Sequence, residues 1–136
     1  MNAPQEIPQL DDITEKMTAV LNAQRADYLA EGAVSAEVRI DRLKRGIDGL
    51  IKYQDQFVAA LNTDFSCRPR QASMLTDVAA SITGMKHSIK HLRKWMKAEK
   101  RPTLFPLNLL GGRSRIEYQP LGVVGVIAPW NFPIYL

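Results

Sequence analysis

The last sixteen residues, LGVVGVIAPWNFPIYL from Leu121 to Leu136, constrain the fold more than any other part of the chain. They carry no charged side chain, and they contain a short β-branched run made of Val123, Val124, Val126 and Ile127. An apolar run without polar alternation is typical of a strand buried on both faces of a parallel sheet. We therefore predict a buried strand over residues 123–127.

A stiff turn is expected directly after this strand. Pro129 lacks the amide N–H that a ladder needs, and Pro133 prevents a helix from continuing, so Asn131 lies on a turn framed by two prolines. Ligands of open α/β sheets bind at the carboxyl ends of the strands. Asn131 is therefore the first candidate for a functional residue.

The run GVVGVIAPWNFP resembles the first strand and turn of the dinucleotide-binding domain in the aldehyde dehydrogenase superfamily, and NFPIYL resembles its coniferyl-aldehyde, class-3-like branch. A weaker resemblance reaches back to about residue 35. It implies an α/β, Rossmann-like fold and the oxidation of an aryl or coniferyl-type aldehyde to the acid. It further implies NAD or NADP as cofactor, a cysteine thiohemiacetal, and a homodimer or higher oligomer.

The same resemblance assigns roles to residues of the turn. Asn131 matches the asparagine whose amide N–H binds the tetrahedral oxyanion, and the positions that match cofactor contacts are Ile127, Ala128, Pro129 and Trp130. Phe132 and Tyr135 would line the aldehyde channel. The alternative for Asn131 is a residue selected for turn geometry alone, which the surrounding motif disfavours, and core packing could explain the others.

The chain before this segment divides into three parts. Residues 1–11 are expected to be an irregular arm, and residues 12–112 to hold three helices and a crossing loop. The helices are expected at residues 12–31, 36–61 and 70–98, each with an apolar stripe at helical spacing. Gly32 is expected to follow the first helix in the left-handed conformation, and Ser35 to cap the second. Gly46 and Gly49 in the second helix predict close packing by a neighbour, and the stripe of the third helix includes Leu75 and Val78. These stripes can face one another or a different element. Residues 113–120 are expected to form a strand of the oligomerisation sheet, and residues 121–136 to begin the dinucleotide-binding domain.

Composition fits an ordinary globular protein, with 46% apolar and 24% charged residues in 136. We expect a cytoplasmic location, because no signal peptide is apparent, the terminal apolar run is too short to span a membrane, and Cys67 has no partner for a disulfide.

The cationic residues of segment 86–101 suggest a solvated helix face rather than a nucleic-acid site. His87 and His91 have helical spacing but no third metal ligand, so no metal is expected.

The apolar terminal segment needs neighbouring strands and covering helices that the preceding residues do not provide. We therefore expect these residues to be the N-terminal part of a longer protein, and the resemblance implies that the catalytic cysteine and glutamate lie outside the sequence. Cys67 has no base placed beside it and is not expected to be the nucleophile. The alternative is a self-contained helical interaction module whose apolar tail docks on a partner.

Overall fold

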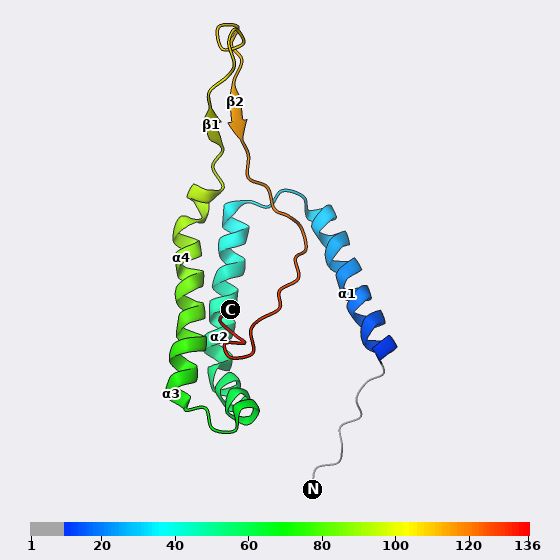
Figure 1. The fold of residues 1–136 in the computed structure, drawn as a ribbon, viewed down its shortest axis with the longest axis vertical. Coiled ribbons are helices and arrows are strands. Elements are labelled where there is room, and N and C mark those ends of the chain that lie inside the picture. The colour runs from blue at the N-terminus through cyan, green and yellow to red at the C-terminus, as the bar shows by residue number, and fades with distance from the viewer. Residues whose placement is uncertain (1–9) are drawn as a thin grey trace. The chain divides into compact units, whose positions relative to one another are not determined.

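The computed structural model describes residues 10–136, most of which are helical (Figure 1). Residues up to Ala33 form one compact unit with Pro120–Gly125, and Val34–Gln119 form a second with Val126–Leu136. No helix within residues 10–136 is both long enough and apolar enough to cross a bilayer. The elements in order are α1 Leu10–Glu31, α2 Ala36–Phe65, α3 Arg70–Ser73, the π-helix η1 Met74–Ala79, α4 Ala80–Trp95, β1 Glu99–Arg101 and β2 Ser114–Ile116.

Helix α1 already includes Leu10, so the predicted start at Asp12 was two residues too late. Asp12 instead lies inside the helix, where its carboxylate binds Lys16 at 2.7 Å. Gly32 follows the helix with a φ of 66°, as the sequence predicted. The expected arm at residues 1–11 lies outside the described residues except for its last two, which are helical.

The rest of the first unit is the segment Pro120–Gly125, which lies against α1. The hydroxyl of Tyr28 donates to the carbonyl of Pro120 at 3.1 Å. Gly122 has a φ of 99°, and a Cβ there would lie 3.5 Å from the Tyr28 ring. Met17 and Val20 remain 68% and 58% exposed and line an open apolar groove of about 720 Å³ in this unit. The apolar stripe of α1 is therefore only partly covered by the described residues.

Helix α2 begins as predicted and ends later. The Ser35 side chain caps it by accepting from the Val38 amide at 3.4 Å, and the helix continues to Phe65, beyond the expected end near residue 61. Ser66 ends it in the left-handed conformation, with a φ of 64°. The chain then reverses and enters α3.

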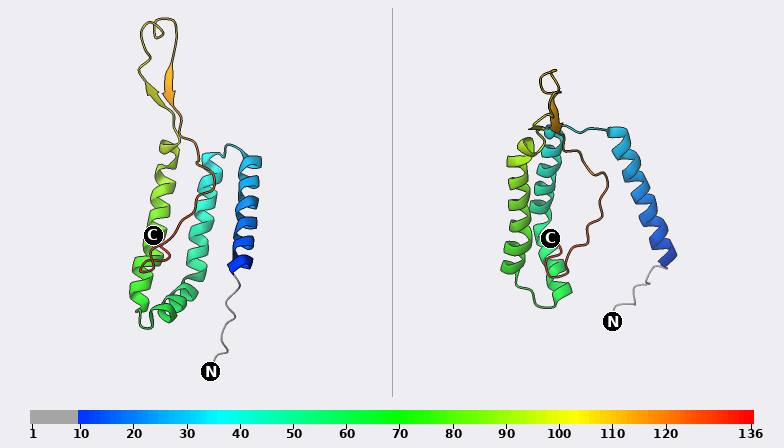
Figure 2. Two further views of the ribbon diagram at one scale, coloured as in Figure 1. Left: turned by 45° about the vertical axis from the view of Figure 1, so that its right-hand side comes forward. Right: turned by 45° about the horizontal axis from the view of Figure 1, so that its top comes forward.

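Helices α2 and α4 lie side by side (Figures 1 and 2). The predicted apolar stripes of the second and third helices therefore face each other, at least in part. At Gly46 the two helices approach closely, because a Cβ there would lie 3.4 Å from the sulfur of Met85. Gly49 has nothing within 4 Å of its virtual Cβ, so the close packing expected there is absent from the described residues. The buried apolar residues of this unit are Ile40, Ile47, Val58, Leu61 and Val78.

The third predicted helix is interrupted by a π-helix and ends at Trp95 rather than at residue 98. Hydrogen bonds from i to i+5 widen the turn and change which residues face inward. Leu75 and Val78 were both expected on the buried stripe, and Val78 is buried as predicted, but Leu75 is 70% exposed. Asp77, which was not expected on the stripe, is buried. The regular spacing of the sequence could not show this change of phase.

Strands β1 and β2 form an antiparallel hairpin that extends past the end of α4 (Figure 1). Glu99 pairs with Ile116, and Arg101 pairs with Ser114. A strand forms within the expected range 113–120 but covers only residues 114–116, and its part in an oligomerisation sheet stays a prediction. Strand β1 occupies the start of what was expected to be a loop. Beyond β2, the Tyr118 hydroxyl donates to Glu99 at 2.9 Å, which raises the pKa of Tyr118.

The strand predicted over residues 123–127 does not form in this structure. Val126 and Ile127 are 79% and 95% exposed, on a segment without regular structure. The reason is that a strand needs a hydrogen-bonded neighbour, and the only strands within residues 10–136 are β1 and β2, which pair with each other. The β-branched composition therefore has no sheet to join here.

We expect Ser66→Gly to stabilise the protein by about 1 kcal/mol, because glycine adopts a positive φ without the cost that a Cβ imposes. Urea unfolding measures the change. The matched control is Ser88→Gly inside α4, which should destabilise by roughly 0.5 kcal/mol because glycine disfavours a helix interior. Destabilisation by both substitutions would contradict the role assigned to the conformation of Ser66.

We expect Glu37 to make folding stability depend on pH. Its pKa lies below the ordinary 4.5, because its carboxylate accepts hydrogen bonds from its own backbone N–H, from Arg93 and from Ser35. The lowered pKa stabilises the fold above pH 4.5, and this contribution is lost as the pH falls through the folded-state value. Glu37→Gln should therefore destabilise at neutral pH and lose its effect in acid. Urea unfolding across that range tests this, and an effect independent of pH would contradict it.

Candidate functional site

The segment that follows Pro129 forms the tight turn that the sequence predicted. The amide of Phe132 donates to the carbonyl of Pro129 at 3.1 Å, which makes Asn131 the third residue of a four-residue turn. A second bond joins the amide of Leu136 to the carbonyl of Phe132 at 3.2 Å. The end of the chain is thus a compact, internally bonded structure.

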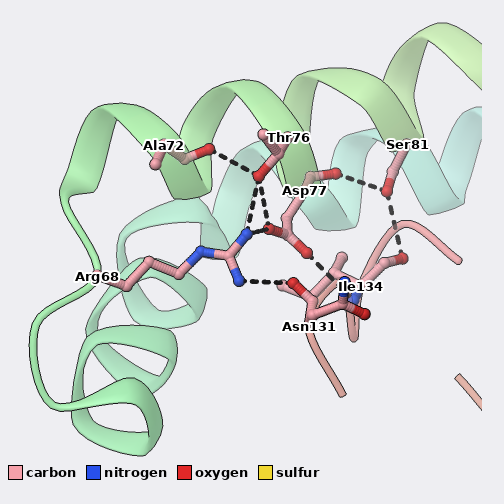
Figure 3. Close-up of polar contacts among 7 residues, drawn as sticks. All are labelled: Arg68, Ala72, Thr76, Asp77, Ser81, Asn131 and Ile134. Atoms are coloured by element: carbon pink, nitrogen blue, oxygen red, sulfur yellow. Dashed lines mark hydrogen bonds and ion pairs between the residues drawn. The ribbon is translucent and has the colours of Figure 1, made fainter. Parts of the chain in front are cut away.

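Arg68 connects this turn to the helices of its unit (Figure 3). The residue lies in the short loop between α2 and α3, and its Nη1 donates to the main-chain carbonyl of Asn131 at 2.8 Å. Its Nη2 donates to the carboxylate of Asp77 at 2.6 Å. One guanidinium group therefore joins the turn to the π-helix.

Asp77 is the buried centre of the arrangement, with a side chain 0% exposed beside an Arg68 side chain 13% exposed. Its Oδ2 accepts from Arg68, while its Oδ1 accepts from the amide of Ile134 at 3.4 Å. A buried carboxylate is stable only when it is paired and hydrogen-bonded, and both conditions are met here. The ion pair thus contacts the turn segment at two points, the carbonyl of Asn131 and the amide of Ile134.

Two hydroxyl groups extend this network. Thr76 Oγ1 accepts from Arg68 Nη2 at 2.9 Å, and its single proton is shared between the carbonyl of Ala72 at 2.8 Å and Asp77 Oδ2 at 3.0 Å. The Ser81 hydroxyl lies 2.6 Å from the carbonyl of Asp77 and 3.2 Å from that of Ile134. Polar groups of residues 72–81 therefore surround the contacts that Arg68 and Asp77 make with the turn segment.

Aromatic rings flank the guanidinium of Arg68. The guanidinium carbon Cζ of Arg68 lies 5.0 Å from the ring centre of Phe65 and 5.7 Å from that of Phe132. Both distances are within the range of a cation–π interaction. The predicted channel residue Phe132 therefore also contributes to the packing around Arg68.

The side chain and the main chain of Asn131 differ in their hydrogen bonding. The main-chain carbonyl is held by Arg68, whereas the residue is exposed and its carboxamide has no hydrogen bond within residues 10–136. A donor on a fixed backbone that is still open to its surroundings is suited to bind a ligand oxygen.

The predicted cofactor residues lie on one continuous segment that leads into the turn. Ile127 and Trp130 are 95% and 89% exposed, Pro129 is exposed, and Ala128 is half-buried. Tyr135, predicted for the substrate channel, is 46% exposed and borders a hollow of about 440 Å³ against α4. The structure therefore places Asn131 and Phe132 on one four-residue turn and Tyr135 within the hydrogen-bonded segment 132–136 that follows it, with an uncovered apolar segment before the turn.

Sequence reasoning missed Arg68 and Asp77. Asp77 precedes Val78 in an otherwise apolar and weakly polar stretch, and a carboxylate beside a core position could have indicated a buried partner. Arg68 offered no comparable signal, because only the reversal at Ser66 brings it beside the turn.

The other residues considered from the sequence lie elsewhere. The rings of His87 and His91 are 4.2 Å apart, and His91 stacks on Trp95 at 5.7 Å. No group of three or more potential metal ligands occurs within the described residues. Cys67 is exposed in the loop beside Arg68, and its sulfur forms no disulfide.

The family model described as "Aldehyde dehydrogenase family" matches residues 6–136. The chain belongs to the aldehyde dehydrogenase family. This confirms the resemblance drawn from the residues around Asn131, and it identifies the mostly helical structure as part of that family's α/β domain.

Similar proteins include several bacterial enzymes. The chain is 47% identical to a probable coniferyl aldehyde dehydrogenase of Caulobacter vibrioides, over 100% of this chain and 28% of that protein. It is 39% identical to a coniferyl aldehyde dehydrogenase of a Pseudomonas species, over 90% of this chain and 24% of that protein. Aldehyde dehydrogenase family 3 member H1 of Arabidopsis thaliana is 33% identical over 74% of this chain and 20% of that protein. The chain thus spans roughly a quarter of the length of these relatives.

We expect Asp77→Ala to destabilise the chain by roughly 3 kcal/mol or more, because the change leaves a largely buried guanidinium unpaired. The matched control is Asp55→Ala. Asp55 also pairs with an arginine at 2.6 Å, but both partners are more than half exposed, so its loss should cost no more than about 1 kcal/mol. Urea unfolding of both variants provides the comparison, and similar losses would contradict the importance of burial.

Proposed function

We propose that this chain contributes the oxyanion donor of an NAD(P)-dependent aldehyde dehydrogenase, and that the donor is the side-chain amide of Asn131. The observation that carries the proposal is the arrangement of Asn131 itself. Its backbone is held by the turn and by Arg68, while its carboxamide remains exposed and without a partner in the described residues.

The arrangement argues against a purely conformational reason for this asparagine. Asparagine often occurs in turns because it tolerates a positive φ or bonds the amide two residues on. In residues 10–136, Ser66 is the only residue other than glycine with a positive φ, so Asn131 does not have one. The residue two positions on is Pro133, which has no amide N–H to donate. Neither usual reason applies.

The proposed reaction needs such a donor. A thiolate adds to the aldehyde carbon, and negative charge develops on the aldehyde oxygen. An amide N–H held in place by its backbone stabilises that charge with little reorganisation, which lowers the barrier. The 136 residues contain one cysteine, Cys67, which lacks a base, so the proposal assigns the nucleophile and the general base to other parts of an enzyme of the relatives' length.

The cofactor proposal, NAD or NADP, concerns the segment before the turn. The large apolar side chains of Ile127 and Trp130 are almost fully exposed, which fits contact with the ribose and nicotinamide of a dinucleotide. Bound there, NAD(P)+ would accept the hydride. Ala128 and Pro129 would add backbone contacts, and the phosphates would need residues other than these.

The substrate proposal is an aryl aldehyde of the coniferyl type. It is supported by the names of the two bacterial relatives and by two aromatic residues near Asn131, Phe132 on the same turn and Tyr135 just after it. Aromatic walls favour a planar aromatic substrate. The match of the family model to residues 6–136 disfavours the alternative of a separate interaction module, because it includes the apolar tail on which that alternative rested.

The oligomer proposal concerns the hairpin. Residues near its tip form an exposed apolar cluster, with exposed fractions of 79%, 73%, 73% and 79% at Leu104, Phe105, Leu109 and Leu110. Apolar clusters of this kind mark protein–protein contacts. This supports a homodimer or higher oligomer in which the hairpin carrying β2 takes part.

The cytoplasmic location expected from the sequence remains a prediction.

We expect Asn131→Ala to lower kcat by about 10²–10³-fold in an enzyme of family length that carries this segment, because one oxyanion donor is lost. Cofactor affinity and the unfolding midpoint should change little. Stopped-flow measurement of NAD(P)H formation with an aryl aldehyde reports the step directly. The control is Asn62→Ala on the exposed surface of α2, and a wild-type rate for Asn131→Ala would refute the proposed donor.

A further inference from the structure

We propose that Arg68 and Asp77 are positioning residues, which together fix the orientation of the Asn131 turn and so aim its carboxamide at the reacting oxygen. The inference rests on the proposed function of Asn131. It adds that two residues distant in sequence from the turn, and without a proposed contact to substrate or cofactor, control the rate through it.

The first argument is that the ion pair contacts the turn segment at two points. Arg68 Nη1 binds the carbonyl of Asn131 at 2.8 Å, and Asp77 Oδ1 binds the amide of Ile134 at 3.4 Å. One contact alone would leave the turn free to rotate about it. Two contacts three residues apart, one to an acceptor and one to a donor, restrict that rotation.

The second argument concerns the geometry of the guanidinium group. Arg68 uses Nη1 for Asn131 and Nη2 for Asp77, so a planar group with fixed N–H directions relates the turn to the helix. A lysine ammonium is a compact charge on a flexible stem and does not impose this relation. The arrangement therefore depends on arginine and not only on positive charge.

The third argument is that the contacts are shielded from water. Asp77 is 0% exposed, Arg68 is 13% exposed, and the rings of Phe65 and Phe132 flank the guanidinium. Hydrogen bonds and ion pairs are stronger in such surroundings than at an exposed surface. By contrast, the Arg70–Asp55 pair nearby is exposed on both sides and does not touch the turn in the described residues.

The fourth argument is that stability alone does not explain the pair. A buried ion pair is often replaceable by apolar residues without loss of stability, because desolvation offsets the attraction. Apolar residues could pack against the turn, but they would not bind the carbonyl of Asn131 and the amide of Ile134 in fixed directions. The directional contacts therefore point to positioning.

The test uses two variants and a matched control in an enzyme of family length that carries this segment. Arg68→Lys keeps the positive charge beside Asp77 but removes the planar fork. The double variant Arg68→Met with Asp77→Asn removes both charges, so no buried charge is left unpaired and folding is preserved. Arg70→Lys is the control, since it makes the same change in an exposed arginine two residues away.

Three quantities are measured for each variant. Hydrogen exchange at the amides of Phe132, Ile134 and Leu136 reports how firmly the turn is held. Stopped-flow kinetics report the rate of NAD(P)H formation, and a titration reports cofactor affinity. We expect faster exchange at these amides and a kcat lowered by about 10²-fold, the effect of a displacement of roughly 1 Å, with cofactor affinity unchanged. Arg70→Lys should match the wild type in every measurement.

Asn131→Ala separates this inference from the proposed function. If Asn131→Ala abolishes the rate while both Arg68 variants keep wild-type rates, the positioning role is refuted and the oxyanion donor stands. If Asn131→Ala is fully active, the proposed donor is refuted, and with it the positioning of that donor, whatever the exchange rates show. Combining Asn131→Ala with Arg68→Lys should slow the reaction no further than Asn131→Ala alone, and additive losses would overturn the inference.

Discussion

The buried carboxylate of Asp77 is the constraint on which the second structural unit depends. A charged group that is 0% exposed needs a partner of opposite charge and further donors. Arg68 meets the first need, and the amide of Ile134 meets part of the second. The left-handed Ser66 brings Arg68 back toward the helix, and the π-helix turns Asp77 inward. The loop, the wide helical turn and the end of the chain are thus arranged around one ion pair.

The segment over residues 123–127 shows the opposite situation. Its sequence strongly favours a β-strand, but no neighbouring strand within the described residues pairs with it. Its β-branched residues favour a strand, but a strand is stabilised by its neighbours more than by its own composition. In the described residues it remains irregular, with Ile127 95% exposed. In the proposed enzyme, other strands and a bound dinucleotide would cover this surface. Burial of such side chains stabilises by about 25 cal/mol per Å², a substantial driving force for those contacts.

Features that depend on neighbouring residues in the sequence were predictable, and features that depend on distant ones were not. The cap at Ser35, the left-handed Gly32 and the turn after Pro129 follow from local chemistry and were found as predicted. The exposure of Leu75 was missed because the π-helix shifts the phase of an otherwise regular stripe. The contact between Arg68 and Asn131 spans 63 positions and leaves no periodic signal. The turn that carries the candidate residue Asn131 was therefore predictable from the sequence, and the contacts of Arg68 and Asp77 that hold this turn were not.

The position of Arg68 also bears on which group would meet the developing negative charge. A guanidinium beside the turn could in principle bind the oxyanion itself. The N–H donors of Arg68 are instead directed at Asp77, Thr76 and the carbonyl of Asn131. Its charge is paired with Asp77 at 2.6 Å, and its side chain is only 13% exposed. A charge neutralised in this way adds little attraction for a second anion. The carboxamide of Asn131 is exposed and has no hydrogen bond within residues 10–136, which supports the proposal that the charged residue holds the turn and the neutral one contacts the oxyanion.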